Sequence, residues 1–258
     1  MIPIKTPQEI DRMRASCKLA SAILEKLSGV LCPGISTKDV DQCAAKLMKE
    51  AGCRSAFLGY RRFPGHICIS VNDEVVHGIG GPRRIQYGDI VKLDVGVVLD
   101  GFVGDTAATV PVGIVSEDVQ RLLAVTEDAL AKGIEKVREG RRLNEVCGAI
   151  QDEVESNGFS VVREFVGHGV GRNLHEEPQI PNYRNPGATI KLKAGMTLAI
   201  EPMVNMGKAV VKVLDDDWTV VTADNSPSAH FEHTVLVTKR EPEILTWREE
   251  TSSKLKAR

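Results

Sequence analysis

The hydrophobic and polar positions of the chain predict helices followed by strands, in an order that occurs twice. Thr6-Pro7-Gln8-Glu9 has the features of a helix start, with Thr as the N-cap, Pro at the first helical position and Glu at the third. Apolar residues then recur every three or four positions as far as Leu27, before Pro33-Gly34 breaks the chain. We expect two further helices, one capped by Ser36 or Thr37 and ending at Ala51-Gly52, and one from Ser116 to about Lys136.

Runs rich in Val, Ile and Leu predict the strands. No linker rich in Pro or Ser divides the chain, and the order of helices then strands favours an α+β fold with a largely antiparallel sheet. A doubly wound parallel sheet is not expected. The predicted strands are Ile67–Val71, Ile90–Leu99, Phe102–Val110, Met196–Val204, Val210–Leu214, Trp218–Ala223 and Phe231–Val237.

A weak internal repeat relates two segments that lie 106 residues apart. Amphipathic helices resemble one another, so coincidence is the alternative. Both bounding glycines keep the offset, and this favours a duplicated half. Gly34, Val40, Ala44, Leu47, Met48 and Gly52 match Gly140, Val146, Ile150, Glu153, Val154 and Gly158, with one apolar mismatch at Glu153.

Composition narrows the class of protein. A chain of 258 residues is long enough for one large domain or for two halves that share a core. A net charge of −2 gives no reason to expect nucleic acid or an anionic membrane, and no signal peptide or membrane-spanning run is apparent. The 6 cysteines form no Cys-x-x-Cys pair, so we expect reduced, mostly buried thiols in a cytosolic protein.

Two aspartates are predicted to share one face of a hairpin. Asp100-Gly101 between two strand-like runs is a strong signal for a two-residue turn, which pairs Leu99 with Phe102. Counting back along both strands makes Asp94 and Asp105 diagonal neighbours, about 7–8 Å apart between backbones. Two carboxylates at that distance repel each other unless a cation lies between them.

The residues opposite these aspartates are small. Gly96 and Ala107 would leave room for a cation on the same face. The alternative is a pair of solvent-facing aspartates on an edge strand. That reading is reasonable for either residue alone, but it is weaker for the pair because the region is rich in Val, Leu and Ile.

Three further residues extend the carboxylate pair to a candidate metal site. Glu201 and Glu232 each stand alone in an apolar run, where a buried salt bridge to Arg172 or Lys92 is an equal alternative for either residue. His168 and a second imidazole lie seven residues apart among glycines. For the whole set, an oxygen-rich site for two divalent ions is favoured.

Other motifs are missing or weak. There is no His-Glu-x-x-His sequence and no phosphate-binding loop, and the dinucleotide fingerprint fails because Arg172 and Leu174 occupy glycine positions. Cys68 could be a nucleophile in principle, but nothing nearby indicates an activated thiolate. Ser70 and Ser160 lack the partners of a catalytic triad.

The other histidines have different expected roles. We expect His66, His230 and His233 on surfaces or in structural hydrogen bonds. His77, in a glycine-rich loop, is a candidate hydrogen-bond donor beside a metal site.

The motifs taken together resemble the type I methionine aminopeptidases. The similarity runs in the correct order from about Thr6 to Thr246. It implies the pita-bread (creatinase/aminopeptidase-like) fold, a pseudo-twofold antiparallel sheet flanked by helices. It also implies one catalytic domain of two pseudo-symmetric halves, about 1–112 and 113–246, with a frayed tail over 247–258. The motifs are Lys92-Leu-Asp94-Val-Gly, Gly101-Phe-Val-Gly-Asp105-Thr, Gly167-His168-Gly-Val-Gly, His175-Glu-Glu-Pro, Ile200-Glu201-Pro-Met and Phe231-Glu232-His-Thr.

The resemblance also implies a role for each site residue. The implied metal ligands are Asp94, Asp105, His168, Glu201 and Glu232. The catalytic residues would be Glu201 as general base and then acid, His175 on the oxyanion and His77 on the substrate backbone. Leu174 stands where these enzymes commonly have Phe, and Phe57 stands where they commonly have a smaller residue. The resemblance therefore does not determine the shape of the pocket. The implied methionine pocket is lined by Phe57, Tyr60, Phe63, Cys68, Leu174 and Trp218, and His77 and His175 contact the substrate.

By the same resemblance, the protein would remove the initiator methionine from nascent chains and prefer a small second residue. It would use two divalent ions of Co, Mn, Fe(II) or Zn. We expect a cytoplasmic monomer that meets nascent N-termini at the ribosome and binds neither a specific nucleic acid sequence nor a membrane. The alternatives are a relative that cleaves X-Pro bonds, which the short N-terminal region disfavours, and a binding module that has lost its metals, which the complete ligand set disfavours.

Overall fold

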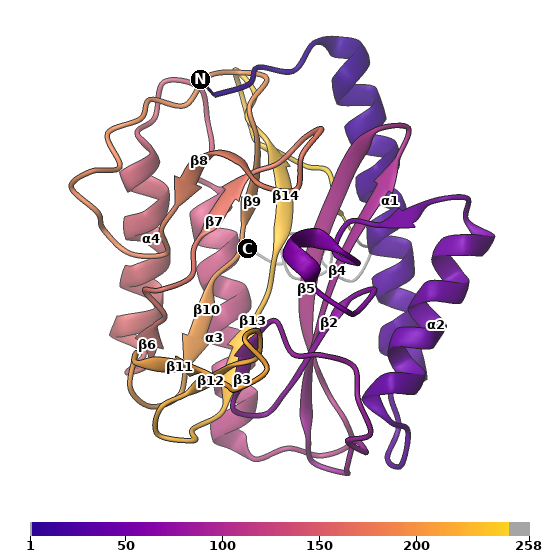
Figure 1. The fold of residues 1–258 in the computed structure, drawn as a ribbon. Coiled ribbons are helices and arrows are strands. Elements are labelled where there is room, and N and C mark those ends of the chain that lie inside the picture. The colour runs from indigo at the N-terminus through magenta and orange to yellow at the C-terminus, as the bar shows by residue number, and fades with distance from the viewer. Residues whose placement is uncertain (1, 248–258) are drawn as a thin grey trace.

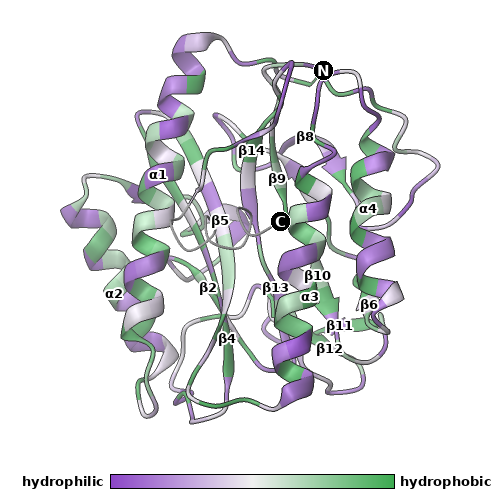
Figure 2. Ribbon diagram, turned by 180° about the vertical axis from the view of Figure 1, so that it is seen from behind, coloured by the Kyte–Doolittle hydropathy of each residue, from purple (hydrophilic) through white to green (hydrophobic). Residues whose placement is uncertain are grey.

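The computed structural model describes residues 2–247, and most of the predicted tail, 248–258, lies outside the described residues. The four α-helices within residues 2–247 lie on one side of the strands, an arrangement that Figures 1 and 2 show from opposite directions. Hydrophobic and hydrophilic residues are mixed along each helix, as expected where one face is buried (Figure 2). None of the helices within residues 2–247 is long and apolar enough to cross a bilayer. The helices are α1 (Pro7–Val30), α2 (Thr37–Glu50), α3 (Glu117–Ile134) and α4 (Leu143–Ser156), with a short 3-10 turn, η1 (Tyr60–Arg62).

The predicted helix starts are confirmed. Thr6 caps α1 in a capping box with Glu9, and Ser36 caps α2 in the same way with Asp39. Ser116 caps α3, whose last residue is Ile134.

The offset of 106 residues extends beyond the residues that first suggested it. α4 repeats the position and length of α2, and the Glu145 carboxylate accepts from the Arg142 N–H at 2.9 Å, as the Asp39 carboxylate accepts from the Ser36 N–H at 3.2 Å. Gly34 and Gly140 both have positive φ, 95° and 88°, as do Gly52 and Gly158. The boundary between halves near residue 112 stays a prediction.

The strands of residues 2–247 form four hydrogen-bonded sheets, in which every pairing between named strands is antiparallel. β4 pairs with β1, β2 and β5, and β12 pairs with β11 and β3. The remaining sheets have the orders β13-β10-β6 and β15-β14-β9-β7-β8. The strands are β1 (Arg54–Ser55), β2 (Cys68–Val71), β3 (Glu74–Val76), β4 (Ile90–Leu99), β5 (Phe102–Pro111), β6 (Ser160–Val161), β7 (Gly167–Gly169), β8 (Glu176–Ile180), β9 (Thr197–Ile200), β10 (Met203–Asn205), β11 (Val211–Val213), β12 (Val220–Thr222), β13 (Ser228–His230), β14 (His233–Leu236) and β15 (Glu243–Ile244).

One predicted strand is divided and another begins later than predicted, and both differences fall at a predicted ligand. Glu201-Pro202 separates β9 from β10, and Phe231-Glu232 separates β13 from β14. At both breaks the chain leaves one sheet and enters another, and Pro202 has no N–H for a ladder. The prediction of one continuous strand over Met196–Val204 was therefore wrong, and Glu232, predicted inside the strand Phe231–Val237, lies just before the first residue of β14, His233.

Hydrogen bonds tie β5 to residues 230–234 of the second half. The Glu232 N–H donates to the Ala107 carbonyl at 3.0 Å, and the Thr106 hydroxyl donates to the Glu232 carbonyl at 2.9 Å. The Thr234 hydroxyl donates to the Asp105 carbonyl at 2.8 Å. The backbones that carry Asp105 and Glu232 are thereby held side by side.

Gly104 allows β5 to lie directly against α1. A Cβ at this position would meet the backbone of Ser16 and would lie 2.5 Å from the Cys17 nitrogen. Since neither backbone segment can move freely, Gly104→Ala should destabilise the protein by roughly 1–3 kcal/mol. Thermal unfolding should show a Tm lower by about 2–4 °C per kcal/mol. Gly29→Ala, where a Cβ meets nothing within 4 Å, is the control and should not lower Tm. Equal Tm values for Gly104→Ala and wild type would contradict the close packing.

Candidate metal centre

The hairpin brings Asp94 and Asp105 to one face, as predicted. Leu99 pairs with Phe102, Asp94 with Ala107 and Gly96 with Asp105. The turn residues Asp100 and Gly101 have φ of 49° and 78°, as a type I′ turn requires. The register prediction is confirmed.

The space above Gly96 is not available to a cation. A Cβ on Gly96 would lie 2.7 Å from the Cζ atom of Phe57. The ring of Phe57 therefore fills the room that the sequence left open at this position. The expectation that Gly96 makes space for an ion was wrong, because a residue from another segment packs there.

Four acidic side chains and one imidazole gather beside this hairpin. Ligand atoms of Asp105, His168 and Glu232 lie within 4.8 Å of one another. The His168 Nε2 atom lies 3.8 Å from Asp105 Oδ2 and 3.4 Å from Glu201 Oε1. Asp94 lies close enough to Glu201 for the charge of Glu201 to raise its pKa.

Several carboxylate oxygens in the cluster have no protein donor. Within residues 2–247, no hydrogen-bond partner reaches the buried Asp94 Oδ1, Asp105 Oδ1 or Glu232 Oε1 atoms. A buried charged oxygen without a partner is strongly unfavourable. Cations bound among these oxygens would remove that cost, so the donor set fits divalent metal ions.

The electrostatics of the cluster agree with this fit. Burial is the first cause that raises the pKa of Asp94, Asp105, Glu201 and Glu232 well above the ordinary value, and repulsion from a neighbouring carboxylate is the second. Bound cations reverse both causes, since they stabilise the ionised forms.

His168 presents a lone pair to the carboxylates. Its Nδ1 atom lies 2.9 Å from the Gly169 carbonyl, to which it donates, and Nε2 is therefore left without a proton in the neutral ring. Burial, followed by the charge of His175, lowers the pKa of His168 to about 3. The ring is thus neutral and can act as a metal ligand at neutral pH.

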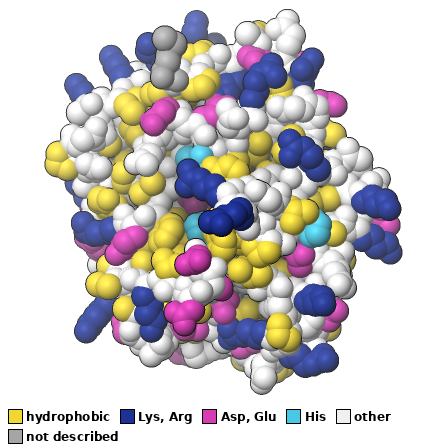
Figure 3. Space-filling model, in the orientation of Figure 1, with side chains coloured by type: hydrophobic (Ala, Val, Ile, Leu, Met, Phe, Trp, Pro, Cys, Tyr) yellow, Lys and Arg dark blue, Asp and Glu magenta, His cyan; other side chains and the backbone are white. Residues whose placement is uncertain are grey.

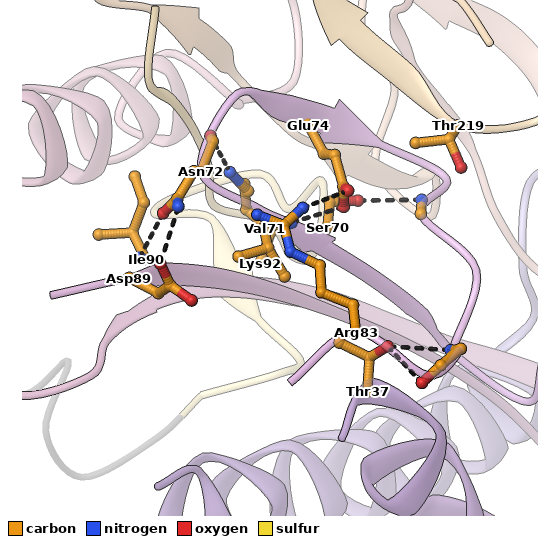
Figure 4. A network of polar contacts seen from close by, with 12 residues as sticks. Thr37, Ser70, Val71, Asn72, Glu74, Arg83, Asp89, Ile90, Lys92 and Thr219 are labelled. Atoms are coloured by element: carbon orange, nitrogen blue, oxygen red, sulfur yellow. Dashed lines mark hydrogen bonds and ion pairs between the residues drawn. The ribbon is translucent and has the colours of Figure 1, made fainter. Parts of the chain in front are cut away.

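Neither expected counterion of Glu201 or Glu232 reaches these residues. The ammonium group of Lys92 donates to the Asn72 and Ser228 carbonyls at 2.6 and 2.9 Å (Figure 4 shows Lys92 beside Asn72). Arg172 pairs with Glu9 at 3.1 Å. The buried salt bridge is therefore excluded for the partners that the sequence suggested.

His175 and His77 border the cluster. His175 Nδ1 lies 2.8 Å from the Tyr60 hydroxyl, and its ring centroid lies 4.2 Å from that of His168. His175 is solvent-accessible, yet the packing around its ring lowers its pKa, and the charge of Arg61 lowers it further. His77, at φ 61°, meets Trp218 edge to face at 6.0 Å, and burial lowers its pKa to about 4.

The structure brings the predicted pocket residues together. Phe63 and Trp218 meet edge to face with ring centroids 5.0 Å apart. Burial, then the charge of Asp94, raises the pKa of Cys68 well above its usual value, so a nucleophilic thiolate is disfavoured. One hydrophobic cluster contains Phe57, Tyr60, Phe63, Cys68, Leu174 and Trp218.

His230 is a site residue that the sequence interpretation missed. Its ring is buried, Nε2 lies 3.6 Å from Glu201 Oε2, and neither ring nitrogen has a hydrogen-bond partner within residues 2–247. The expectation of a surface or structural role was wrong for this histidine, although His66 contacts Asp41 and His233 contacts Thr246 as expected. The signal was its position two residues before Glu232.

In the space-filling view, the face opposite the helices has a hollow in which acidic and histidine side chains are visible (Figure 3). Basic side chains lie at its border, and hydrophobic side chains surround it. This combination of a polar floor and an apolar wall is typical of a site that holds one end of a ligand in a fixed orientation.

Known proteins resemble this chain over nearly its full length. The profile of metallopeptidase family M24 matches residues 11–239. Methionine aminopeptidase 1 of Bacillus subtilis is 50% identical over 246 residues, which cover 95% of this chain and 99% of that protein. The crystal structure of methionine aminopeptidase from Thermotoga maritima has a TM-score of 0.94 and 46% identity, and the match covers 96% of this chain and 100% of that one. The prolidase of Pyrococcus furiosus, with a TM-score of 0.79, is 24% identical, and the match covers 95% of this chain but 65% of that one, so it shows the fold alone.

Proposed function

The chain belongs to metallopeptidase family M24, and we propose that it removes the N-terminal methionine from proteins and peptides by metal-dependent hydrolysis. The buried cluster of Asp105, His168 and Glu232 beside an apolar pocket is the observation that carries this function. The direct test is release of free methionine from Met-Ala-Ser by purified protein whose metal content has been measured.

Asp94, Asp105, His168, Glu201 and Glu232 are the residues that would hold two divalent ions. When bound, such ions act as Lewis acids and lower the pKa of water. The unpartnered carboxylate oxygens and the lone pair on His168 Nε2 support this ligand set. The identity of the ion is left open, because oxygen-rich sites accept several divalent metals.

Glu201 has the geometry for two tasks. Its Oε1 atom faces His168, and its Oε2 atom faces His230 at 3.6 Å. One carboxylate oxygen of Glu201 can therefore serve as a metal ligand beside His168. The other oxygen can accept a proton from water and return it to the leaving amine. These are the roles of a general base and a general acid.

His175 is assigned to the oxyanion and His77 to the substrate backbone. The Tyr60 hydroxyl can donate to His175 Nδ1, and this leaves a proton on Nε2. A neutral Nε2–H is a suitable donor to an oxyanion. His77, beside Trp218, lies next to the apolar pocket and can orient the bound chain.

The enzyme should prefer methionine first and a small residue second. The pocket around Phe63, Cys68 and Trp218 is apolar and suits an unbranched thioether side chain. We expect Met-Gly-Met-Met to be turned over much faster than Met-Leu-Met-Met, with free methionine measured by chromatography. Equal rates, or faster cleavage of X-Pro peptides, would count against this assignment.

X-Pro cleavage is the second candidate function. The similarity to a prolidase, at 24% identity and over 65% of that chain, shows a shared fold and does not favour this reaction. Identity of 50% across nearly the whole of a methionine aminopeptidase favours the first function.

Nascent chains at the ribosome are the proposed substrates, and a cytoplasmic monomer is the proposed form. All 6 cysteines are free, as expected in a reducing compartment. Sedimentation with and without ribosomes would test both the contact and the oligomeric state.

A further inference from the structure

Two consecutive arginines adopt a backbone conformation that favours glycine. Arg61 and Arg62, in the turn η1, have φ of 47° and 75°. Side chains other than those of glycine and, to a lesser extent, Asn and Asp rarely occupy this region, and two in succession are rarer still. The turn is closed by ordinary backbone hydrogen bonds from Arg62 to Gly59 and from Phe63 to Tyr60, at 3.1 and 2.8 Å. These bonds do not require arginine, so the two side chains invite a functional explanation.

The turn lies at the edge of the candidate site. The guanidinium of Arg61 lies 5.5 Å from the centroid of the Tyr60 ring, and Tyr60 contacts His175 through its hydroxyl at 2.8 Å. The positive charge of Arg61 also acts on His175. The turn therefore lies next to His175 at the edge of the candidate site, and basic side chains lie at the border of the hollow in Figure 3.

Neither Arg61 nor Arg62 has an acidic partner among the described residues, 2–247. Some other exposed arginines are neutralised, for example Arg172 by Glu9 and Arg83 by Glu74, whereas others, such as Arg54, have no ion pair within residues 2–247. Within residues 2–247, no carboxylate forms an ion pair with Arg61 or Arg62. Two adjacent, exposed and unneutralised guanidinium groups form a local site for an anion, and guanidinium matches carboxylate well.

We propose that Arg61 and Arg62 bind carboxylates of the peptide beyond its second residue, so that the enzyme favours substrates with an acidic third residue. This inference rests on the proposed function. With the methionine side chain in the pocket, an extended chain places its third residue about 7 Å beyond the first. That residue then emerges past His175 toward the turn. The net charge of −2 and the small size of the basic patch favour a peptide carboxylate over a nucleic acid.

The test compares peptides that differ in one charge. C-terminally amidated Met-Ala-Asp-Ser, Met-Ala-Asn-Ser and Met-Ala-Lys-Ser are to be ranked by kcat/KM. We expect a ratio of about 5 or more between the Asp and Lys peptides at low salt, which falls toward 1 in high salt as screening increases. A preference for free-acid Met-Ala-Ser over its amide would show that a C-terminal carboxylate can take the same position.

Variants assign the effect to the turn. Arg61→Gln combined with Arg62→Gly removes both guanidinium charges. The ratio of kcat/KM between the Asp and Lys peptides should then fall to within about twofold, because exposed charges elsewhere on the surface contribute little. Lys46→Ala combined with Lys49→Ala on α2 removes the same net charge elsewhere and should leave the ratio unchanged. Arg62→Gly alone should raise Tm, since glycine adopts positive φ without strain, while it lowers the ratio. This split between stability and selectivity is not expected for a purely structural residue.

Each outcome bears on a different claim. A wild-type ratio near 1, or an unchanged ratio in the double variant, would overturn the inference while the proposed function stands. If none of the peptides released methionine, the proposed function would fail and the inference with it. Inhibition by RNA without discrimination among the peptides would assign the two arginines to a nucleic acid instead and would likewise overturn the inference.

Discussion

Removal of divalent metal should abolish methionine release by this protein, and addition of Mn or Co should restore it. The reason is the carboxylate cluster, in which buried oxygens of Asp94, Asp105 and Glu232 have no donor within residues 2–247. Glu201 and His175 alone cannot supply the Lewis acid that the reaction needs. The measurement is hydrolysis of Met-Ala-Ser after dialysis against EDTA, then after titration with each metal. Full activity in protein shown by elemental analysis to be metal-free would exclude the two-metal site.

The same experiment has a consequence for stability that depends on pH. The four site carboxyls have raised pKa values without metal, so above pH of about 4 the folded chain binds more protons than the unfolded chain. The stability of the metal-free protein contributed by these groups therefore falls as the pH rises toward the raised pKa values. Metal ions replace those protons, and the gain in Tm on binding metal should grow as the pH rises.

The gain in Tm can be measured at about pH 5.5 and about pH 7.5. The free metal concentration is kept the same at both pH values; where it equals about 100 Kd, binding contributes about 2.7 kcal/mol, or about 5–10 °C. Burial lowers the pKa of Lys92 to about 7, so this residue makes stability rise with pH, opposite to the carboxyls. Its effect is present with and without metal, and it therefore cancels when the gain in Tm is compared instead of Tm itself. A gain that shrinks with rising pH would mean that the carboxyls are not the ligands.

Replacement of His175 by alanine should lower kcat by about 10²–10³, with metal content and KM nearly unchanged. The ring lies beside His168, but its Nδ1 atom is engaged by Tyr60, so it is oriented without being needed as a ligand. A donor that acts mainly on the developing oxyanion changes kcat more than substrate affinity.

Tyr60→Phe is the matched control for the orientation of His175. It removes one hydrogen bond to the ring and should lower kcat by only about 2–10-fold. Loss of metal in His175→Ala would make this histidine a ligand. If His175→Ala kept the wild-type kcat, the ions or His77 would have to stabilise the oxyanion instead.

The parts of the structure that short-range chemistry determines could be predicted from the sequence. Thr6 and Glu9 specify a helix start within four residues, and Asp100-Gly101 specifies a turn whose register follows by counting. The positions of Asp94 and Asp105 depend only on that local register. Prediction succeeded where one turn or cap was sufficient.

Features that depend on distant segments could not be derived in this way. The ring that covers Gly96 comes from Phe57, and the breaks at Glu201 and Glu232 arise because each chain segment moves from one sheet to another. The residues before and after each break are equally hydrophobic, so the sequence gives no local signal that the chain changes sheets there. His230 was missed because its neighbour Glu201 is far away in sequence.

The hydrogen bonds between β5 and residues 230–234 hold together two segments that are far apart in the sequence, and both segments carry residues of the reaction centre. The Glu232 amide is bonded to Ala107, and the Asp105 carbonyl to Thr234. These contacts cannot open one at a time without separating the strands that carry the ligands. Exchange of the Glu232 amide with deuterium should therefore require global unfolding, and two separately produced fragments would have no reaction centre until they associate. Loss of catalysis on heating and loss of the folded state should consequently be one event.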